Sequence, residues 1–232
     1  MLHKVVQLGG KSYFWLEKTN VVSMIQEYQV SGFRVREYEE LGSTNTEAER
    51  VGWSELEDKM VILTYRQTQG RGQVGNHWES EPGKNISMTV VFKPRELLAG
   101  QQFAVSMVIA LGACDFISRY VSGCSVKWPN DIYVGDRKIS GILIEHSIMG
   151  RYVGGSLCGI GVNINQERFL SDAPNPVSLF QLIGEEIPVE QALEELLDCI
   201  GKRYETIRDY EGLERDFLKV LYRREGVYDW ED

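Results

Sequence analysis

Five short segments carry residue types that can contact a carboxylate, a phosphate or a nucleotide. They are Ser-Thr-Asn at 43–45, the glycine-bearing stretch 67–73, Lys-Trp-Pro-Asn-Asp at 127–131, Arg-Lys-Ile-Ser-Gly at 137–141 and Gly-Ile-Gly-Val-Asn at 159–163. Cations, amides, hydroxyls and glycines dominate them. Such groups bind and orient anions rather than act as nucleophiles. The segments therefore favour a site that binds an anionic ligand.

Residues 67–84 form a long, polar, glycine-bearing stretch. Glycines let the backbone approach a ligand closely, and Arg71, between Gly70 and Gly72, suits bidentate contact with a carboxylate or phosphate. The stretch buries little apolar surface, so we expect it to be mobile until a ligand orders it. The alternative is a plain surface loop with a solvated arginine.

A hairpin is expected where Gly135-Asp136 separates two strand-like runs. It would bring Lys138 close to residues 131–133, with Lys-Trp-Pro-Asn-Asp at its start. The alternative is an ordinary exposed Lys–Asp pair. The glycines at 159 and 161 either let a ligand lie against a strand, with Asn163 offering an amide to a base or ribose, or mark bends in a core strand.

Two other glycine patterns do not support nucleotide folds of the usual kinds. Gly-Lys-Ser at 10–12 lacks the earlier glycine of a Walker A loop, because Val5 occupies that position. Residues 70–75 match Gly-x-Gly-x-x-Gly, yet more loop follows instead of the helix that a dinucleotide fold requires. Protein-kinase motifs are absent downstream.

The elements that must position these segments are helices and short strands in irregular alternation. Helices are expected over 20–31, from near Ser43, and over 96–121, 188–210 and 214–222, the second from the capping-box spacing of Thr44 and Glu47. Strands are expected over 34–38, 61–66, 85–93, 125–128, 131–134, 138–146 and 152–162. Hairpins outnumber β-helix-β crossovers, which predicts an α+β fold with a mostly antiparallel, mixed sheet flanked by helices.

Composition excludes several classes of protein. The net charge of -9 and pI near 5.0 argue against non-specific binding of nucleic acid. We expect no membrane span and no secretory signal, and hence a cytoplasmic protein. The cysteines and histidines are dispersed, so neither a disulfide framework nor a metal cluster is expected; they are Cys114, Cys124, Cys158, Cys199, His3, His77 and His146.

Taken together and in this order, the five segments resemble the biotin–protein ligase family over roughly residues 34–225. The Lys-Trp-Pro-Asn-Asp run, followed by Arg-Lys-Ile-Ser-Gly-Ile-Leu-Ile-Glu at 137–145, is its most specific feature. The resemblance implies an α+β fold similar to class II aminoacyl-tRNA synthetases. It also implies a reaction in which biotin and ATP, with Mg²⁺, give biotinyl-5'-adenylate, and the lysine of a biotin carboxyl carrier protein then displaces AMP.

That chemistry suits the residue inventory, because an ionised carboxylate needs no general base and two anions must instead be aligned by cations. By resemblance, the catalytic residues are Arg71 and Lys138. The residues implied for biotin are Ser43, Thr44, Asn45, Gln67, Arg71, Gly72, Gln73, Trp128, Lys138, Gly141, Gly159 and Gly161, with Trp128 as a wall of the pocket. Those implied for ATP are Arg71, Trp78, Lys127, Asn130, Asp131 and Asn163. No metal ligand is assigned.

The sequence also departs from the family pattern. Many members carry further basic residues after Gly-Arg-Gly, where this chain has Gln73, Val74 and Asn76. We expect residues 1–33 to be an N-terminal extension of unassigned role, too short for a winged-helix DNA-binding domain. Residues 34–232 are expected to form the catalytic domain, without the C-terminal β-barrel-like domain of many members. The sequence leaves open whether the chain is a monomer or a homodimer.

Three alternatives to a biotin ligase remain. A lipoate–protein ligase shares the fold, but it would carry a different glycine-rich signature. A non-catalytic protein that binds biotin or an adenylate would be consistent with the missing loop cation. A soluble domain with coincidental motifs is the third.

Overall fold

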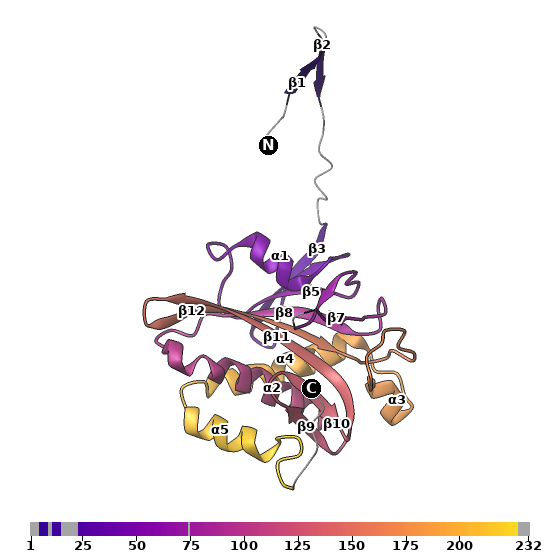
Figure 1. Cartoon of the computed structure of the whole chain (residues 1–232), viewed down its shortest axis with the longest axis vertical. Coiled ribbons are helices and arrows are strands. Elements are labelled where there is room, and N and C mark those ends of the chain that lie inside the picture. The colour runs from indigo at the N-terminus through magenta and orange to yellow at the C-terminus, as the bar shows by residue number, and fades with distance from the viewer. Residues whose placement is uncertain (1–4, 9–10, 15–22, 74, 227–232) are drawn as a thin grey trace.

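The computed structural model describes residues 5–8, 11–14, 23–73 and 75–226. Its centre is an eight-stranded sheet in the order β3-β4-β5-β8-β12-β11-β10-β9, in which β4 and β5 are parallel and all other neighbours antiparallel (Figure 1). The strands of this sheet are β3 (Met24–Val30), β4 (Phe33–Tyr38), β5 (Met60–Thr64), β8 (Ile86–Phe92), β9 (Cys124–Lys127), β10 (Asp131–Val134), β11 (Arg137–Met149) and β12 (Tyr152–Val162). The predicted mixed, mostly antiparallel α+β fold is confirmed.

Two small hairpins and the helices complete the fold. The hairpins pair β1 (Val5–Leu8) with β2 (Lys11–Phe14), and β6 (Gly70–Arg71) with β7 (His77–Trp78). The helices are α1 (Thr44–Val51), the 3₁₀ turn η1 (Ala99–Gln101), α2 (Phe103–Ile117), α3 (Leu179–Ile183), α4 (Val189–Glu205) and α5 (Tyr210–Lys219). Helix α1 packs on β5, β8 and β12, whereas α2 packs on β9, β10 and β11 and is backed by α4 and α5 (Figure 1).

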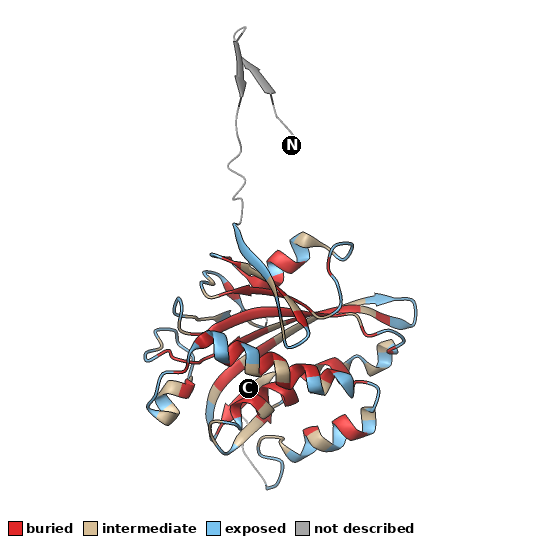
Figure 2. Cartoon of the chain, turned by 180° about the vertical axis from the view of Figure 1, so that it is seen from behind, coloured by how far each residue is buried: buried red, intermediate tan, exposed pale blue. Residues whose placement is uncertain are grey.

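The central strands are buried on both faces of the sheet, as their continuous apolar runs require (Figure 2). In β5, Val61 and Leu63 join the large core beneath α2 and α4, while Met60 and Ile62 join a smaller cluster beneath α1. Strand β8 alternates in the same way, but on the α1 side it carries polar residues such as Thr89. This face of the sheet therefore offers buried polar groups to a binding site.

The helix expected over residues 20–31 was wrong. Residues 20–22 lie outside the described residues, and the remainder forms the edge strand β3, paired with β4. Gly32 does not end a helix. With Ser31 it forms a two-residue hairpin turn in which both φ angles are positive, 48° and 78°. The sheet therefore begins before the domain boundary that was expected at residue 34.

The apolar segment Ala99–Ile117 is long enough to cross a membrane by length and composition, contrary to our expectation for the sequence. Burial gives it another role, because α2 lies between the sheet and α4. At Gly112 the two helices approach so closely that an added Cβ would lie 2.8 Å from Cα of Ile200. The segment is the core helix of the fold.

The remaining predicted elements are present, most of them with shifted ends. The Gly135 turn has a φ of 59°, and β10 spans the four residues expected, as β12 spans its eleven. Helix α5 begins at Tyr210 rather than Glu214, because the side chain of Asp209 caps it by accepting a hydrogen bond from the amide of Gly212. The Gly-Lys-Ser pattern at 10–12 lies partly outside the described residues.

Candidate active site

A cavity of about 670 Å³ lies where α1 begins, the β6–β7 hairpin folds over the sheet, and β10, β11 and β12 meet. Its volume is within the range of small-molecule sites. The predicted site residues that line it are Ser43, Thr44, Asn45, Gln67, Arg71, Gly72, Gln73, Trp78, Lys127, Asn130, Asp131, Lys138, Gly141, Gly159, Gly161 and Asn163. One cavity thus brings together all five segments, which are up to 120 residues apart (43 to 163) in the sequence.

The start of α1 forms one wall of the cavity. The capping box expected between Thr44 and Glu47 is absent, because Thr44 is the first residue of the helix and Glu47 pairs with Arg50 at 2.6 Å. Ser43 occupies the N-cap position without a side-chain capping hydrogen bond. The amide of Thr44 donates to Oε1 of Gln67 at 3.0 Å, so the glycine-bearing stretch supplies the cap. The Ser43 hydroxyl is left on the cavity wall without a role in capping.

Asn45 connects this wall to the sheet through a buried hydrogen-bond network. Its Nδ2 donates to Oε2 of Glu145 at 2.8 Å and to the carbonyl of Leu143 at 3.3 Å. Its Oδ1 accepts from the hydroxyl of Thr89 at 2.6 Å and lies so close to Gly159 that no side chain fits there. The lack of a side chain at Gly159, which also lines the cavity, therefore leaves room for Asn45.

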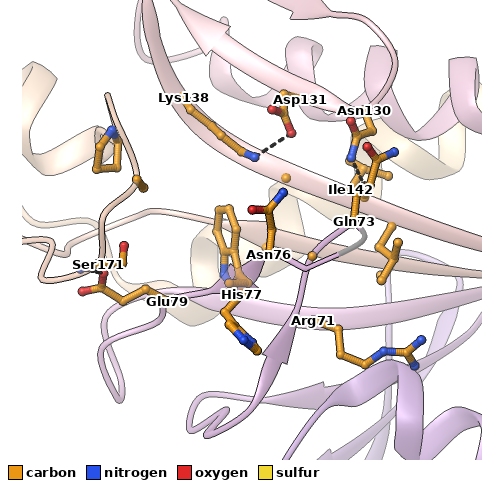
Figure 3. Close-up of a pocket in the computed structure, with 18 of the residues that line it drawn as sticks. Arg71, Gln73, Asn76, His77, Glu79, Asn130, Asp131, Lys138, Ile142 and Ser171 are labelled. Carbon is orange, nitrogen blue, oxygen red and sulfur yellow. Dashed lines mark hydrogen bonds and ion pairs between the residues drawn. The ribbon is translucent and has the colours of Figure 1, made fainter. Parts of the chain in front are cut away.

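Lys138 is the cation at the centre of the cavity. The β10–β11 register pairs it with Tyr133, as predicted, and its Nζ lies 2.7 Å from Oδ1 of Asp131 (Figure 3). The ammonium also lies 5.9 Å from the ring centroid of Trp78. Asn130 lies in the turn at 128–130, just before β10, and its Nδ2 attaches that turn to β11 by donating to the carbonyl of Ile142 at 2.7 Å.

Arg71 lines the same cavity, but its guanidinium points away from Lys138 (Figure 3). It pairs with Oε1 of Glu145 at 2.8 Å and with Oε1 of Glu49 at 3.2 Å. The hydrogen bond with Glu49 and the interactions with Glu145 raise the pKa of Arg71 above its usual value. Partial desolvation opposes this rise but does not cancel it. The two predicted catalytic cations therefore share a cavity without converging on one point.

Trp78 lies over two of the glycines that were expected to carry a ligand, Gly141 and Gly161. A Cβ at Gly141 would lie 2.9 Å from Cζ3 of Trp78, and one at Gly161 would overlap the same ring. Within the described part of the chain, the buried Nε1 of Trp78 and Oδ1 of Asn163 have no hydrogen-bond partner. Because buried polar atoms normally have partners, these two are a donor and an acceptor suited to a bound ligand.

Comparison with known proteins agrees with this geometry. Residues 38–163 match the sequence model of the biotin/lipoate A/B protein ligase family, which is more than half of the chain. The chain belongs to this family. It is 28% identical to the bifunctional ligase/repressor BirA of Bacillus subtilis over 219 residues, 90% of this chain and 66% of that protein. It is 33% identical to the biotin–[acetyl-CoA-carboxylase] ligase of Paracoccus denitrificans over 124 residues, 53% of this chain and 51% of that protein.

The fold of a biotin/lipoate ligase is likewise found among solved structures. The biotin protein ligase from Aquifex aeolicus in complex with biotin and ATP matches with a TM-score of 0.68 at 22% identity, covering 81% of this chain and 78% of that one. The chain therefore spans about half to two thirds of the length of these two curated relatives and 78% of this solved one.

The tryptophan of the Lys-Trp-Pro-Asn-Asp run is the one predicted residue that does not line the cavity. Trp128 precedes a cis peptide bond to Pro129 and is 66% exposed. Its prediction as a wall of the pocket was wrong, because the chain turns at this point and directs the side chain to solvent. Trp78, which was assigned to the nucleotide, forms the aromatic wall instead.

Sequence reasoning missed a whole side of the cavity. The residues that line it without having been predicted are Gly75, Asn76, His77, Glu79, Tyr133, Ile142, Leu143, Ile160, Phe169, Ser171, Asp172, Ala173, Pro174, Asn175 and Pro176. The largest group is the loop over 169–176. Its Pro-Asn-Pro sequence predicts an ordered turn, but nothing in it indicates a chemical role.

The cavity contains few potential metal ligands. Among the described residues, no group of three or more His, Cys, Asp or Glu side chains could hold a metal ion. Asp131 and Asp172 are carboxylates on the wall, and Mg²⁺ is commonly held by one or two carboxylates together with substrate phosphates. The donor set therefore fits Mg²⁺ that is bound mainly by ATP.

Proposed function

We propose that this chain is a biotin–protein ligase, which activates biotin with ATP and transfers it to a lysine of a biotin carboxyl carrier protein. The observation that carries the proposal is the single cavity that unites the Ser43–Asn45 turn, the Gly-Arg-Gly hairpin and Lys138. The relatives named biotin ligases support it, as does the complex of the Aquifex aeolicus protein with biotin and ATP.

In the first step, a carboxylate oxygen of biotin attacks the α-phosphorus of ATP, and the bond to pyrophosphate breaks. Both reactants are anions, so the site must offset their repulsion and hold them in line. The Lys138 ammonium would exchange Asp131 for the carboxylate and then for the phosphate of the adenylate. Mg²⁺, bound by the ATP phosphates with Asp131 or Asp172 as protein ligand, would supply further positive charge.

The neutral ends of both substrates need hydrogen bonds once they are buried. The hydroxyl groups of Ser43 and Thr44 and the side-chain amide of Gln67 are suited to the ureido ring of biotin. Asn163, with its unpartnered Oδ1, would accept a hydrogen bond from the nucleotide. For biotin to lie against Gly141 and Gly161, the ring of Trp78 must move off them, which would free the indole to contact ATP.

In the second step, the unprotonated amine of an acceptor lysine attacks the acyl carbon, AMP leaves, and the nitrogen loses a proton as the amide forms. The acceptor is proposed to be a biotin-carrying carboxylase subunit. We also propose a cytoplasmic location and no binding to nucleic acid, with the domain built on the eight-stranded sheet, β3 included, as the catalytic unit.

The test is incubation of the protein with biotin, ATP, Mg²⁺ and a carrier domain, followed by streptavidin detection and a pyrophosphate assay. Labelling that depends on ATP and on the carrier lysine is expected. Pyrophosphate release with lipoate but not biotin would identify a lipoate ligase. Biotin binding without any pyrophosphate would identify a non-catalytic binding protein.

A further inference from the structure

Glu79 directly follows Trp78 and contacts a segment about ninety residues further along the chain. Its Oε1 accepts a hydrogen bond from the amide of Leu170 at 2.8 Å, and its Oε2 accepts one from the amide of Ser171 at 2.7 Å. Figure 3 shows the Glu79 side chain beside Ser171. A carboxylate that accepts two successive backbone amides is held in both position and orientation. Both donors are backbone amides, so a change of rotamer at Leu170 or Ser171 does not remove them.

A buried amide fixes the carboxylate from the other side. Nε2 of Gln166 donates to Oε1 of Glu79 at 3.0 Å, and Oε1 of Gln166 accepts from Nδ2 of Asn85 at 2.5 Å. Gln166 is 1% exposed and Asn85 is fully buried just before β8. Burial opposes ionisation of Glu79, but the hydrogen bonds from Ser171, Leu170 and Gln166 outweigh it and lower its pKa. The contact is thus anchored in the core.

The segment that Glu79 holds is the unpredicted wall of the cavity, residues 169–176. Its other end is attached to the strand that carries Lys138. The amide of Lys138 donates to the carbonyl of Asn175 at 2.8 Å, and the amide of Val177 donates back to the carbonyl of Lys138 at 2.9 Å. The segment therefore spans from the Trp78 side of the cavity to the Lys138 side.

We propose that Glu79 is a positioning residue, which ties residues 169–176 to the β6–β7 hairpin so that both walls of the nucleotide end of the cavity are held together. The nucleotide assignment of this end rests on the proposed function, because Trp78 and Asn163 are the residues assigned to ATP there. Without the tie, the segment keeps its attachment at Lys138 but loses the one beside Trp78. ATP would then have to order that wall on binding, which weakens its affinity.

The test compares Glu79→Gln with Glu79→Asp and with Glu81→Gln, in the full chain. Glutamine keeps the size of the side chain but has one acceptor oxygen for two amides, whereas aspartate keeps the charge. Glu81 is an exposed acid two residues away, and it is the matched control. Hydrogen exchange at the amides of Leu170 and Ser171 reports the tie without ligand, and steady-state kinetics report its use.

We expect Glu79→Gln to lower the protection of these two amides about tenfold and to raise KM for ATP about tenfold, with kcat within about threefold of wild type. For Glu79→Asp, both the amide protection and the KM for ATP should lie between those of wild type and Glu79→Gln. Glu81→Gln should match wild type. Unchanged protection in Glu79→Gln would overturn the tie. Lost protection with an unchanged KM for ATP would overturn its positioning role.

Failure of the proposed function gives a different result. If the wild-type protein makes no adenylate, hydrogen exchange still decides whether Glu79 holds the segment. Equilibrium binding of a non-hydrolysable ATP analogue then replaces KM. An affinity for the analogue that is equal in wild type and Glu79→Gln would reject the proposal in that case.

Discussion

Replacement of Lys138 by alanine separates the chemical role of its ammonium from its part in stability. The side chain pairs with Asp131 at 2.7 Å, and the two side chains are 31% and 20% exposed. Breaking a fully buried pair costs about 3–5 kcal/mol, and the partial exposure here reduces this to about 1–2 kcal/mol. That is a fraction of the 5–15 kcal/mol typical of domains, so Lys138→Ala should remain folded.

The effect on chemistry should be much larger. A charged group aimed at developing negative charge contributes about 3–4 kcal/mol, so we expect adenylate formation to slow by about 10²–10³-fold. Pyrophosphate exchange measures that rate, and urea unfolding measures stability. The double variant Lys138→Ala/Asp131→Asn should recover most of the lost stability, because it no longer leaves a carboxylate unpaired, but none of the activity.

This combination makes the reasoning refutable. A folded Lys138→Ala protein whose adenylation rate lies within about threefold of wild type would remove Lys138 from the mechanism. Loss of activity that the double variant restored together with stability would show that Lys138 acts only by holding Asp131.

Further changes test other parts of the molecule. Gly161→Ala places a methyl group where the Trp78 ring lies, so KM for biotin should rise about tenfold with little loss of stability, as kinetics and urea unfolding would show. Trp78→Phe should abolish the change in tryptophan fluorescence that ATP binding is expected to cause. Gly112→Ala should destabilise the protein by about 1–3 kcal/mol in urea, because the methyl group meets the backbone of α4 at Ile200. Because folding lowers the pKa of Glu79 from its ordinary value of 4.5, the ionised carboxylate stabilises the protein fully above pH 4.5. This stabilisation is lost as the pH falls through the folded-state pKa. In Glu79→Gln, the free energy of unfolding should therefore depend less on pH below 4.5.

Much of the site was predictable because its residues sit at fixed places on regular elements. The Gly135 turn pairs Lys138 with Tyr133, and side chains two residues apart on a strand share a face, which places Asp131 on the same side as Lys138. The residue types of the Gln67 stretch and of the Ser43 turn also indicated that these segments contact a ligand. The sequence alone did not reveal that Gln67 would cap α1, because that hydrogen bond joins residues 23 apart.

The errors have a common physical origin in tertiary contacts. Residues 24–30 have polar and apolar residues that suit a short helix, but the Ser31-Gly32 turn and the free edge of β4 make them a strand. Trp128 is conspicuous in its motif, yet the turn at Pro129 exposes it. The 169–176 wall could not be found from composition, since its place is set by backbone hydrogen bonds to Glu79 and Lys138.

Arg71 lines the cavity, but its guanidinium is paired with two glutamates that the sequence did not indicate. Its partners, Glu49 and Glu145, are 48% and 34% exposed, and such ion pairs contribute about 1 kcal/mol or less. Glu145 keeps a second hydrogen bond from Asn45, so it stays in place if Arg71 leaves. An anionic ligand in the more enclosed cavity attracts a guanidinium more strongly than these solvated carboxylates do. We therefore expect the guanidinium, rather than the two glutamates, to move when the anionic substrate of the proposed function binds.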